Sequence, residues 1–226
     1  MPVVTATDAL LIIDMQVDFL PGGALAVTGA DALVPVINRL GHLPFGLVVA
    51  TQDWHPADHV SFRKRGGPWP VHCVAGSEGA ALSPALDQAR IGVLLRKGLD
   101  RDIDSYSAFG DNDRIGRTGL EGLLRDRGIT RVFLTGVALD YCVAASARDA
   151  CRAGFDTVVL HDACRSVKTM SGRILETLRA EGIGAASCAD LLPAPNPSFP
   201  TIQPARAAGQ KPVRVLQSAF RSQTMS

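Results

Sequence analysis

The chain has 226 residues, of which 46% are hydrophobic and 20% charged, and its formal net charge at pH 7 is +1. This length is enough for one domain with a full core, and the composition is that of an ordinary globular protein. Residues 193–226 hold four basic side chains and no acid, so residues 1–192 carry 19 basic and 22 acidic side chains. A net negative body excludes a nucleic-acid-binding surface as the main function.

Cysteine usage and the N-terminus both bear on the compartment. The five cysteines are odd in number and form no CxxC motif, so we expect reduced thiols rather than a disulfide framework. The first residues, MPVVTATDALLIIDM, show no basic segment and no small-residue cleavage site. Their apolar run is also too short to span a bilayer. We therefore expect a cytoplasmic protein with no membrane partner.

Short apolar runs alternate with helical patterns along the chain. Runs of strand length occur at 9–13, 46–50, 91–95, 131–137, 156–164 and 183–187. Helices are expected at 30–40, 118–128, from the turn at 138–140 to 154, and at 169–181. The continuous apolarity of the first runs suits strands buried on both faces. The alternation predicts one α/β domain over residues 1–192, with a mostly parallel sheet of about six strands between helices on both faces.

Residues 193–226 differ in character from the rest. They contain six prolines in 34 residues and little periodicity. We expect this C-terminal extension to be extended or disordered.

Four chemically useful side chains follow four of the predicted strands: Asp14, Asp53, Lys97 and Cys142. Because ligands of open parallel sheets bind beyond the carboxyl ends of the strands, we expect these side chains to meet. Taken alone, Cys142 would more often be a buried apolar residue. Asp14, Lys97 and Cys142 together make a base, a cation and a nucleophile. Cys142 also falls in the first turn of its predicted helix, where unpaired N–H groups favour a thiolate.

The loop at 53–80 is rich in turn residues and holds both tryptophans and three of the five histidines. Asp53 and His55 alternate on an extended segment, so both can face one side, and His72 lies in a second turn-rich segment. A carboxylate with two imidazoles suits one divalent ion of Zn, Mn or Fe, although loop histidines can also merely cap turns. His59 could be an extra ligand or could support one of the ligands without contacting the metal, and we favour the supporting position. We expect Cys73 to pack.

Three aromatic residues, Phe19, Trp69 and Tyr106, lie in the same loops as these polar groups. Each alone is more often a packing residue. Because they lie near these polar groups, they could bind a flat aromatic substrate between them.

Several segments together resemble the nicotinamidase family of the isochorismatase-like cysteine hydrolase superfamily, over about residues 8–192: LLIIDMQVDFLPGGALAV, TQDWHPADHVSF, WPVHCV, DSYSAF and GVALDYCV. The resemblance implies hydrolysis of nicotinamide to nicotinic acid and ammonia in NAD salvage, through a cysteine thioester. It also implies that pyrazinamide is accepted. The resemblance leaves open whether the protein forms a homo-oligomer.

The resemblance assigns roles residue by residue. Asp14, Lys97 and Cys142 match the catalytic triad, and Asp53, His55 and His72 match the metal ligands. The peptide before Ala138 matches a position that is cis in the family, where the N–H groups of Ala138 and Cys142 would form an oxyanion hole. Phe19 and Trp69 match the aromatic residues that flank the pyridine ring.

Two rival functions stay open from the sequence. One is another amidase of the superfamily, with a carbamoyl or ureido substrate. The other is a non-catalytic metal-binding or thiol-sensing module. A vinyl-ether hydrolase of the isochorismatase type would need neither the metal loop nor the cysteine.

Overall fold

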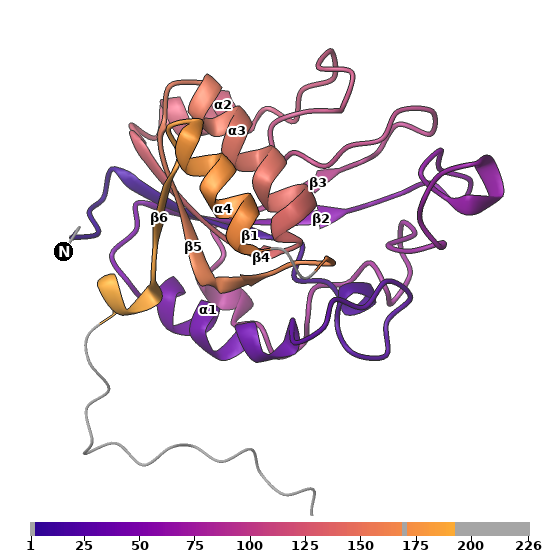
Figure 1. Ribbon diagram of the computed structural model, residues 1–226, viewed down its shortest axis with the longest axis horizontal. Coiled ribbons are helices and arrows are strands. Elements are labelled where there is room, and N and C mark those ends of the chain that lie inside the picture. Colours follow the sequence, from indigo (N-terminus) through magenta and orange to yellow (C-terminus); the bar gives the residue numbers. More distant parts are fainter. Residues whose placement is uncertain (1–2, 169–170, 193–226) are drawn as a thin grey trace, which may run out of the picture. The chain divides into compact units, whose positions relative to one another are not determined.

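A six-stranded sheet forms the centre of the protein. The computed structural model describes residues 3–168 and 171–192, and the predicted C-terminal extension, 193–226, lies outside them. The strands are β1 (Asp8–Ile13), β2 (Leu47–Asp53), β3 (Val93–Lys97), β4 (Arg131–Val137), β5 (Asp156–Arg165) and β6 (Gly184–Ala186). All neighbours pair in parallel, in the order β3-β2-β1-β4-β5-β6 (Figure 1). This confirms the predicted fold class.

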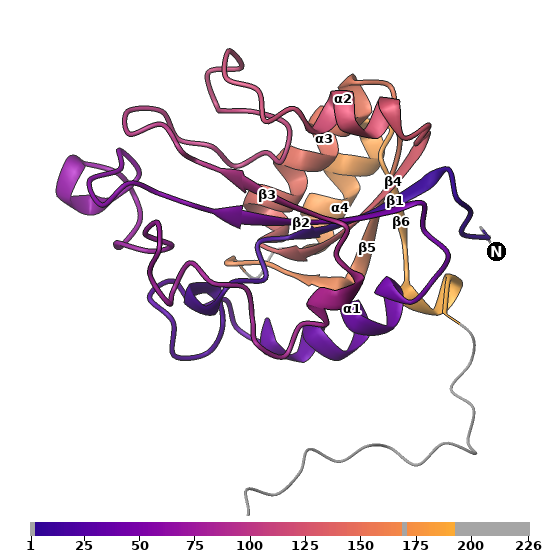
Figure 2. The same ribbon diagram turned by 180° about the vertical axis from the view of Figure 1, so that it is seen from behind.

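Helices cover both faces of the sheet. They are α1 (Val34–Gly41), α2 (Leu120–Asp126), α3 (Ala144–Arg152) and α4 (Ser171–Ala180). Helices α2, α3 and α4 lie on one face and α1 on the other (Figures 1 and 2). The segment predicted as a helix at 30–40 begins as a 3-10 turn and becomes α1, whose Pro35 stands in the first turn, where it removes no helical hydrogen bond. None of the helices in the described residues has the length and apolar character needed to cross a membrane.

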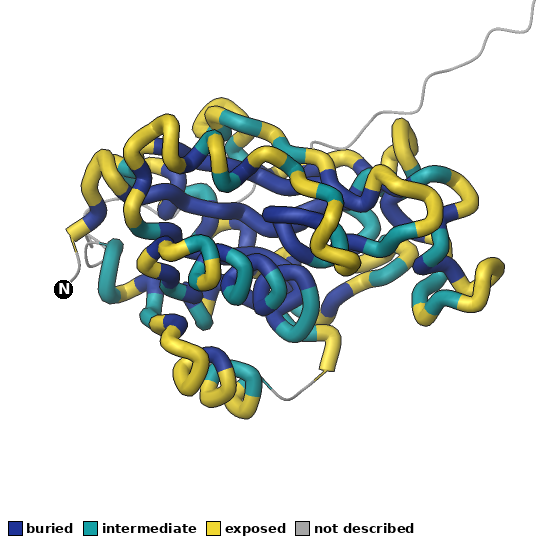
Figure 3. The backbone as a smooth tube through the Cα atoms, turned by 90° about the horizontal axis from the view of Figure 1, so that it is seen from above, coloured by how far each residue is buried: buried dark blue, intermediate teal, exposed yellow. Residues whose placement is uncertain are grey.

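Strand β1 shows why its sequence is continuously apolar. Ala9, Leu11 and Ile13 belong to the core under α2, α3 and α4, whereas Leu10 and Ile12 belong to the core with α1. Because successive side chains point to opposite faces, a strand covered on both faces favours apolar side chains at successive positions. Figure 3 shows the buried strands between exposed loops.

The order of the strands in the sheet indicates where a ligand site is expected. From β1 the chain adds β2 and β3 on one side, and then returns to add β4, β5 and β6 on the other. Ligands of such sheets bind beyond the carboxyl ends of the strands, at the point where the order reverses. Asp14 follows β1 and Ala138 follows β4, so both stand at this point.

Strands β2 and β3 run past their predicted ends. Backbone pairing continues to Asp53 opposite Lys97, through residues whose polarity suggested a loop. Among these residues, Thr51, Asp53 and Lys97 find polar partners at the site described below.

Gly136 allows β1 and β4 to approach next to this site. Its φ is +109°, and a Cβ there would lie 2.1 Å from the carbonyl oxygen of Ile13. We expect Gly136→Ala to lower the free energy of unfolding by about 3 kcal/mol, from backbone strain and overpacking. Gly122→Ala in α2 is the control, since its added Cβ meets no atom within 4 Å; it should stabilise by about 0.5–1 kcal/mol. Urea unfolding of both variants measures this, and equal stability would contradict the steric argument.

Candidate active site and metal centre

The ammonium group of Lys97 lies at the centre of the site. It is fully buried, with Nζ 2.5 Å from Asp53 Oδ1, 3.0 Å from Asp14 Oδ2 and 3.5 Å from Cys142 Sγ. Burial by itself lowers the pKa of Lys97, but the two carboxylates outweigh it and hold that pKa well above its usual value. A buried charge is tolerable only with such partners. The structure thus brings together the three residues predicted as base, cation and nucleophile.

The pKa values of the two carboxyl groups beside Lys97 are shifted in opposite directions. Burial raises the pKa of Asp14 despite the attraction of Lys97. The pKa of Asp53 is held well below its usual value, because Lys97 and His55 outweigh the effect of burial. Pairs of carboxyl groups with pKa values driven apart take different roles in catalysis. Asp14 is therefore suited to accept a proton, and Asp53 to remain an anion.

Cys142 differs from the sequence-based prediction of a thiolate. It lies in a π-helical turn (Leu139–Val143) that leads into α3, and it is buried. Burial raises the pKa of its thiol well above the usual value, and the attraction of Lys97 does not compensate. The prediction was wrong because it counted the helix N-terminus and not the loss of solvent. The resting group is a thiol that needs a base.

The peptide between Val137 and Ala138 is cis, as the family resemblance implied. The carbonyl of Ala138 accepts hydrogen bonds from the N–H groups of Tyr141 and Val143, at 3.0 and 3.1 Å. The N–H group of Ala138 has no acceptor among the described residues. Ala138 and Cys142 line one cavity, so a free N–H donor stands beside the sulfur.

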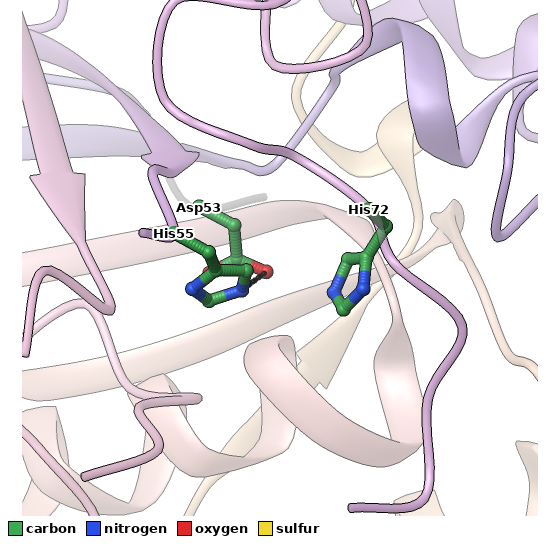
Figure 4. A group of neighbouring side chains, drawn as sticks. All are labelled: Asp53, His55 and His72. Carbon is green, nitrogen blue, oxygen red and sulfur yellow. Dashed lines mark ion pairs between the residues drawn. The ribbon is translucent and has the colours of Figure 1, made fainter. Parts of the chain in front are cut away.

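Asp53, His55 and His72 form a compact group of metal-type ligands. Each offers a ligand atom within 4.8 Å of the others, and all three residues are buried. Asp53 comes from the end of β2, His55 follows it, and His72 comes from the long loop (Figure 4). The donor set, one carboxylate and two imidazoles, fits Zn²⁺, Mn²⁺ or Fe²⁺.

Hydrogen bonds orient both imidazoles of this group. His55 Nδ1 lies 3.0 Å from the carbonyl of Gly98, and His72 Nδ1 lies 2.8 Å from that of Pro70. Since a carbonyl only accepts, each Nδ1 donates and each Nε2 is left with a free lone pair for a metal. Burial lowers the pKa of His72, which favours the neutral ring that a ligand needs. Asp53 raises the pKa of His55 against the effect of burial.

His59 stands behind His55. Its ring stacks on that of His55 with centroids 4.1 Å apart. Both of its nitrogens are occupied, Nδ1 by Ser61 Oγ at 2.7 Å and Nε2 by the carbonyl of Ile103 at 3.1 Å. This arrangement favours a supporting position over direct ligation. Cys73 packs in the core, as expected from its sequence.

The predicted aromatic residues line the cavity that contains Cys142 and the metal-type group: Phe19, Trp69 and Tyr106. The ring of Phe19 lies 5.7 Å from that of His72. Trp69 Nε1 donates to the hydroxyl of Tyr106 at 3.2 Å, and burial raises the pKa of Tyr106 to about 12. The cavity therefore offers flat apolar walls beside a buried polar group.

Two residues of the site were missed in the sequence. Tyr141 lines the cavity and contacts Trp69 edge-on, with ring centroids 4.9 Å apart; its position next to Cys142 was the available signal. Gln16 brackets the main chain of Asp53: its Nε2 donates to the carbonyl and its Oε1 accepts from the N–H, both at 2.8 Å. These bonds continue the pairing of β1 with β2 and hold a metal-type ligand in place.

Known proteins resemble this chain over most of its length. The isochorismatase domain model matches residues 8–185. The nicotinamidase of Acinetobacter baylyi is 43% identical over an alignment of 203 residues, and the match covers 81% of this chain and 94% of that protein. The structure of PnC1 from L. infantum in complex with nicotinate has a TM-score of 0.82 and 46% identity, covering 84% of this chain and 98% of that one.

A second solved structure carries a metal. It is the pyrazinamidase of Pyrococcus horikoshii in complex with zinc, with a TM-score of 0.71 and 39% identity, covering 80% of this chain and 99% of that one. The fold, the cysteine turn and the extent of these matches lead to one conclusion: the chain belongs to the nicotinamidase/pyrazinamidase family of isochorismatase-like hydrolases.

Proposed function

We propose that this protein hydrolyses nicotinamide to nicotinic acid and ammonia, in NAD salvage, and also accepts pyrazinamide. One observation carries the proposal: Asp14, Lys97 and Cys142 form a buried cluster beside the metal-type ligands Asp53, His55 and His72. Aromatic side chains line the cavity that these two groups share. A flat pyridine ring carrying a carboxamide matches each part of this cluster. The names of the relatives support the same reaction. We assign the activity to residues 1–192.

Asp53, His55 and His72 would hold one divalent metal ion, Zn, Mn or Fe. When bound, the ion would orient the substrate through its ring nitrogen, the template role among metal functions. Asp53 can serve both groups, because Oδ1 meets Lys97 while Oδ2 lies 3.7 Å from His55 Nε2. His59 supports His55 by stacking.

Catalysis begins with proton transfer from the Cys142 thiol to Asp14. Burial keeps this thiol protonated at rest, so the nearby carboxylate is required as a base. Lys97 Nζ, 3.5 Å from Sγ, stabilises the thiolate that forms. Phe19, Trp69 and Tyr106 flank the ring, which leaves the carboxamide carbon over the sulfur.

The thiolate then attacks the carboxamide carbon, and the N–H groups of Ala138 and Cys142 stabilise the oxyanion. When the C–N bond breaks, Asp14 returns its proton to the departing ammonia, and a thioester on Cys142 remains. Water attacks the thioester and gives its proton to Asp14. Nicotinic acid leaves, and the proton returns to the cysteine.

The rival functions make different demands. A carbamoyl or ureido substrate lacks the pyridine nitrogen, so the metal-type trio and the aromatic walls would have no partner in it. A thiol-sensing module would need an accessible, reactive thiolate, whereas burial raises the pKa of Cys142. A metal-binding module without catalysis would have no use for Asp14, Lys97 and Cys142 beside the metal-type ligands. These observations favour the nicotinamidase reaction.

We also propose a cytoplasmic location and a small molecule as the main partner, with neither nucleic acid nor membrane bound. All five cysteines are free, which suits a reducing compartment. The excess of acidic side chains in residues 1–192 argues against nucleic acid.

Ammonia release from nicotinamide, measured before and after chelation, tests the reaction and the metal together. We expect release by the untreated protein, its loss on chelation, and its recovery when Zn²⁺, Mn²⁺ or Fe²⁺ is added back. Absence of ammonia with any added metal would refute the proposed reaction. Full activity after complete metal removal would refute the template role alone.

Cys142→Ala should lower kcat by about a thousandfold or more, because the nucleophile is lost. Fold and metal content should not change, since Cys142 is not in the proposed ligand set. Cys151→Ala is the matched control: this cysteine is on α3, half-buried and outside the cavity, and its loss should leave kcat within about twofold. Turnover retained in the Cys142 variant would exclude the thioester route.

Measurement of the metal content of variants distinguishes a metal ligand from a residue that only supports a ligand. His72→Ala removes a proposed ligand that does not touch Lys97, so it is cleaner than any change of Asp53. We expect it to abolish stoichiometric metal binding, measured by elemental analysis after dialysis. His59→Ala should keep one metal per chain and weaken its affinity by about 10–100-fold, as loss of an outer partner does. Equal metal loss in both variants would make His59 a ligand.

A further inference from the structure

We propose that Thr51 is a positioning residue, which occupies one oxygen of Asp14 and so directs the other toward Cys142. The proposal rests on the proposed role of Asp14 as the base. Thr51 lies in β2, the strand beside β1, and the side chains of Thr51 and Asp14 are both fully buried.

Two hydrogen bonds join the pair. The hydroxyl of Thr51 lies 2.5 Å from Asp14 Oδ1, and the N–H of Asp14 lies 3.1 Å from the same hydroxyl oxygen. An amide N–H can only donate, so the hydroxyl oxygen accepts from it. The single hydroxyl proton is then directed to Oδ1.

This arrangement decides which carboxylate oxygen takes a proton. A proton on Oδ1 would weaken the hydrogen bond that this oxygen accepts from the buried Thr51 hydroxyl, because a protonated carboxyl oxygen is a poorer acceptor than a carboxylate oxygen. Complete loss of an acceptor costs a buried donor about 1–3 kcal/mol, which sets the upper limit of this effect. Protonation therefore falls on Oδ2 of Asp14.

Oδ2 is the oxygen that faces Lys97. It lies 3.0 Å from Lys97 Nζ, and a carboxylate oxygen of Asp14 lies within 4.8 Å of Cys142 Sγ. Asp14 also has φ of +50°, which is uncommon for a residue other than glycine. Rotation about the terminal bond of an aspartate is broad, so without Thr51 this carboxylate would lose its alignment with the sulfur.

Three variants test the proposal in the full chain with its metal bound. Thr51→Val removes the hydroxyl and keeps the shape, Thr51→Ser keeps the hydroxyl, and Thr135→Val is the matched control. Thr135 is another fully buried strand threonine, but its hydroxyl donates to the carbonyl of Ala163 at 2.6 Å.

With nicotinamide, Thr51→Val should lower kcat by about 10–100-fold, part of what a well-placed general base contributes, with KM within about twofold. Thr51→Ser should recover kcat to within about threefold of the unmodified protein, and Thr135→Val should leave it within about twofold. Thermal unfolding and metal content should be alike in the two valine variants. Thr51→Ala repeats the comparison if Thr51→Val does not fold.

A second readout separates this proposal from the proposed reaction. If the unmodified protein releases no ammonia, the proposed function is wrong, and Thr51 is then judged by iodoacetamide labelling of Cys142, followed by peptide mass spectrometry. Labelling should be about tenfold slower in Thr51→Val and normal in Thr51→Ser. Unchanged kcat, unchanged or faster labelling, or a serine variant as impaired as the valine variant would overturn the positioning role.

Discussion

The buried ion cluster around Lys97 is the interaction on which the site depends. Its ammonium group, on β3, meets one carboxylate at the end of β2 and another after β1, and it lies 3.5 Å from the sulfur that follows β4. Isolated burial of any of these charges would be prohibitive, so the charges require one another. The same contacts hold four strand ends at one place, and Asp53 extends the cluster to His55 and His72.

The surroundings of the two carboxyl groups in this cluster give them different pKa values. Asp14 and Asp53 are both buried carboxylates beside one lysine, yet their pKa values move in opposite directions, because Asp53 also faces His55. That separation leaves one group able to accept a proton and the other fixed as an anion. Burial raises the pKa of the Cys142 thiol, so the proposed mechanism depends on a correctly placed base.

The long loop at 53–80 contributes side chains to the site that the strands do not provide. The loop folds back on itself through two paired positions, His55 with Val74 and Phe62 with Trp69. These pairs bring His72 opposite Asp53 and place Trp69 on the wall of the cavity. The rigid end of β2 thus fixes Asp53, and a loop anchored to it carries His55, His72 and the aromatic wall of the cavity.

The sequence by itself determined the parallel sheet, because continuous apolar runs such as Ala9–Ile13 are stable only when both faces are covered. It also determined that Asp14, Asp53, Lys97 and Cys142 would meet, since parallel strands end at a common edge. Only the tertiary structure decided the protonation of Cys142, the contact of Thr51 with Asp14 and the place of Tyr141. Desolvation and hydrogen-bond direction depend on neighbours from distant segments and on strand register, which no local pattern of residues encodes.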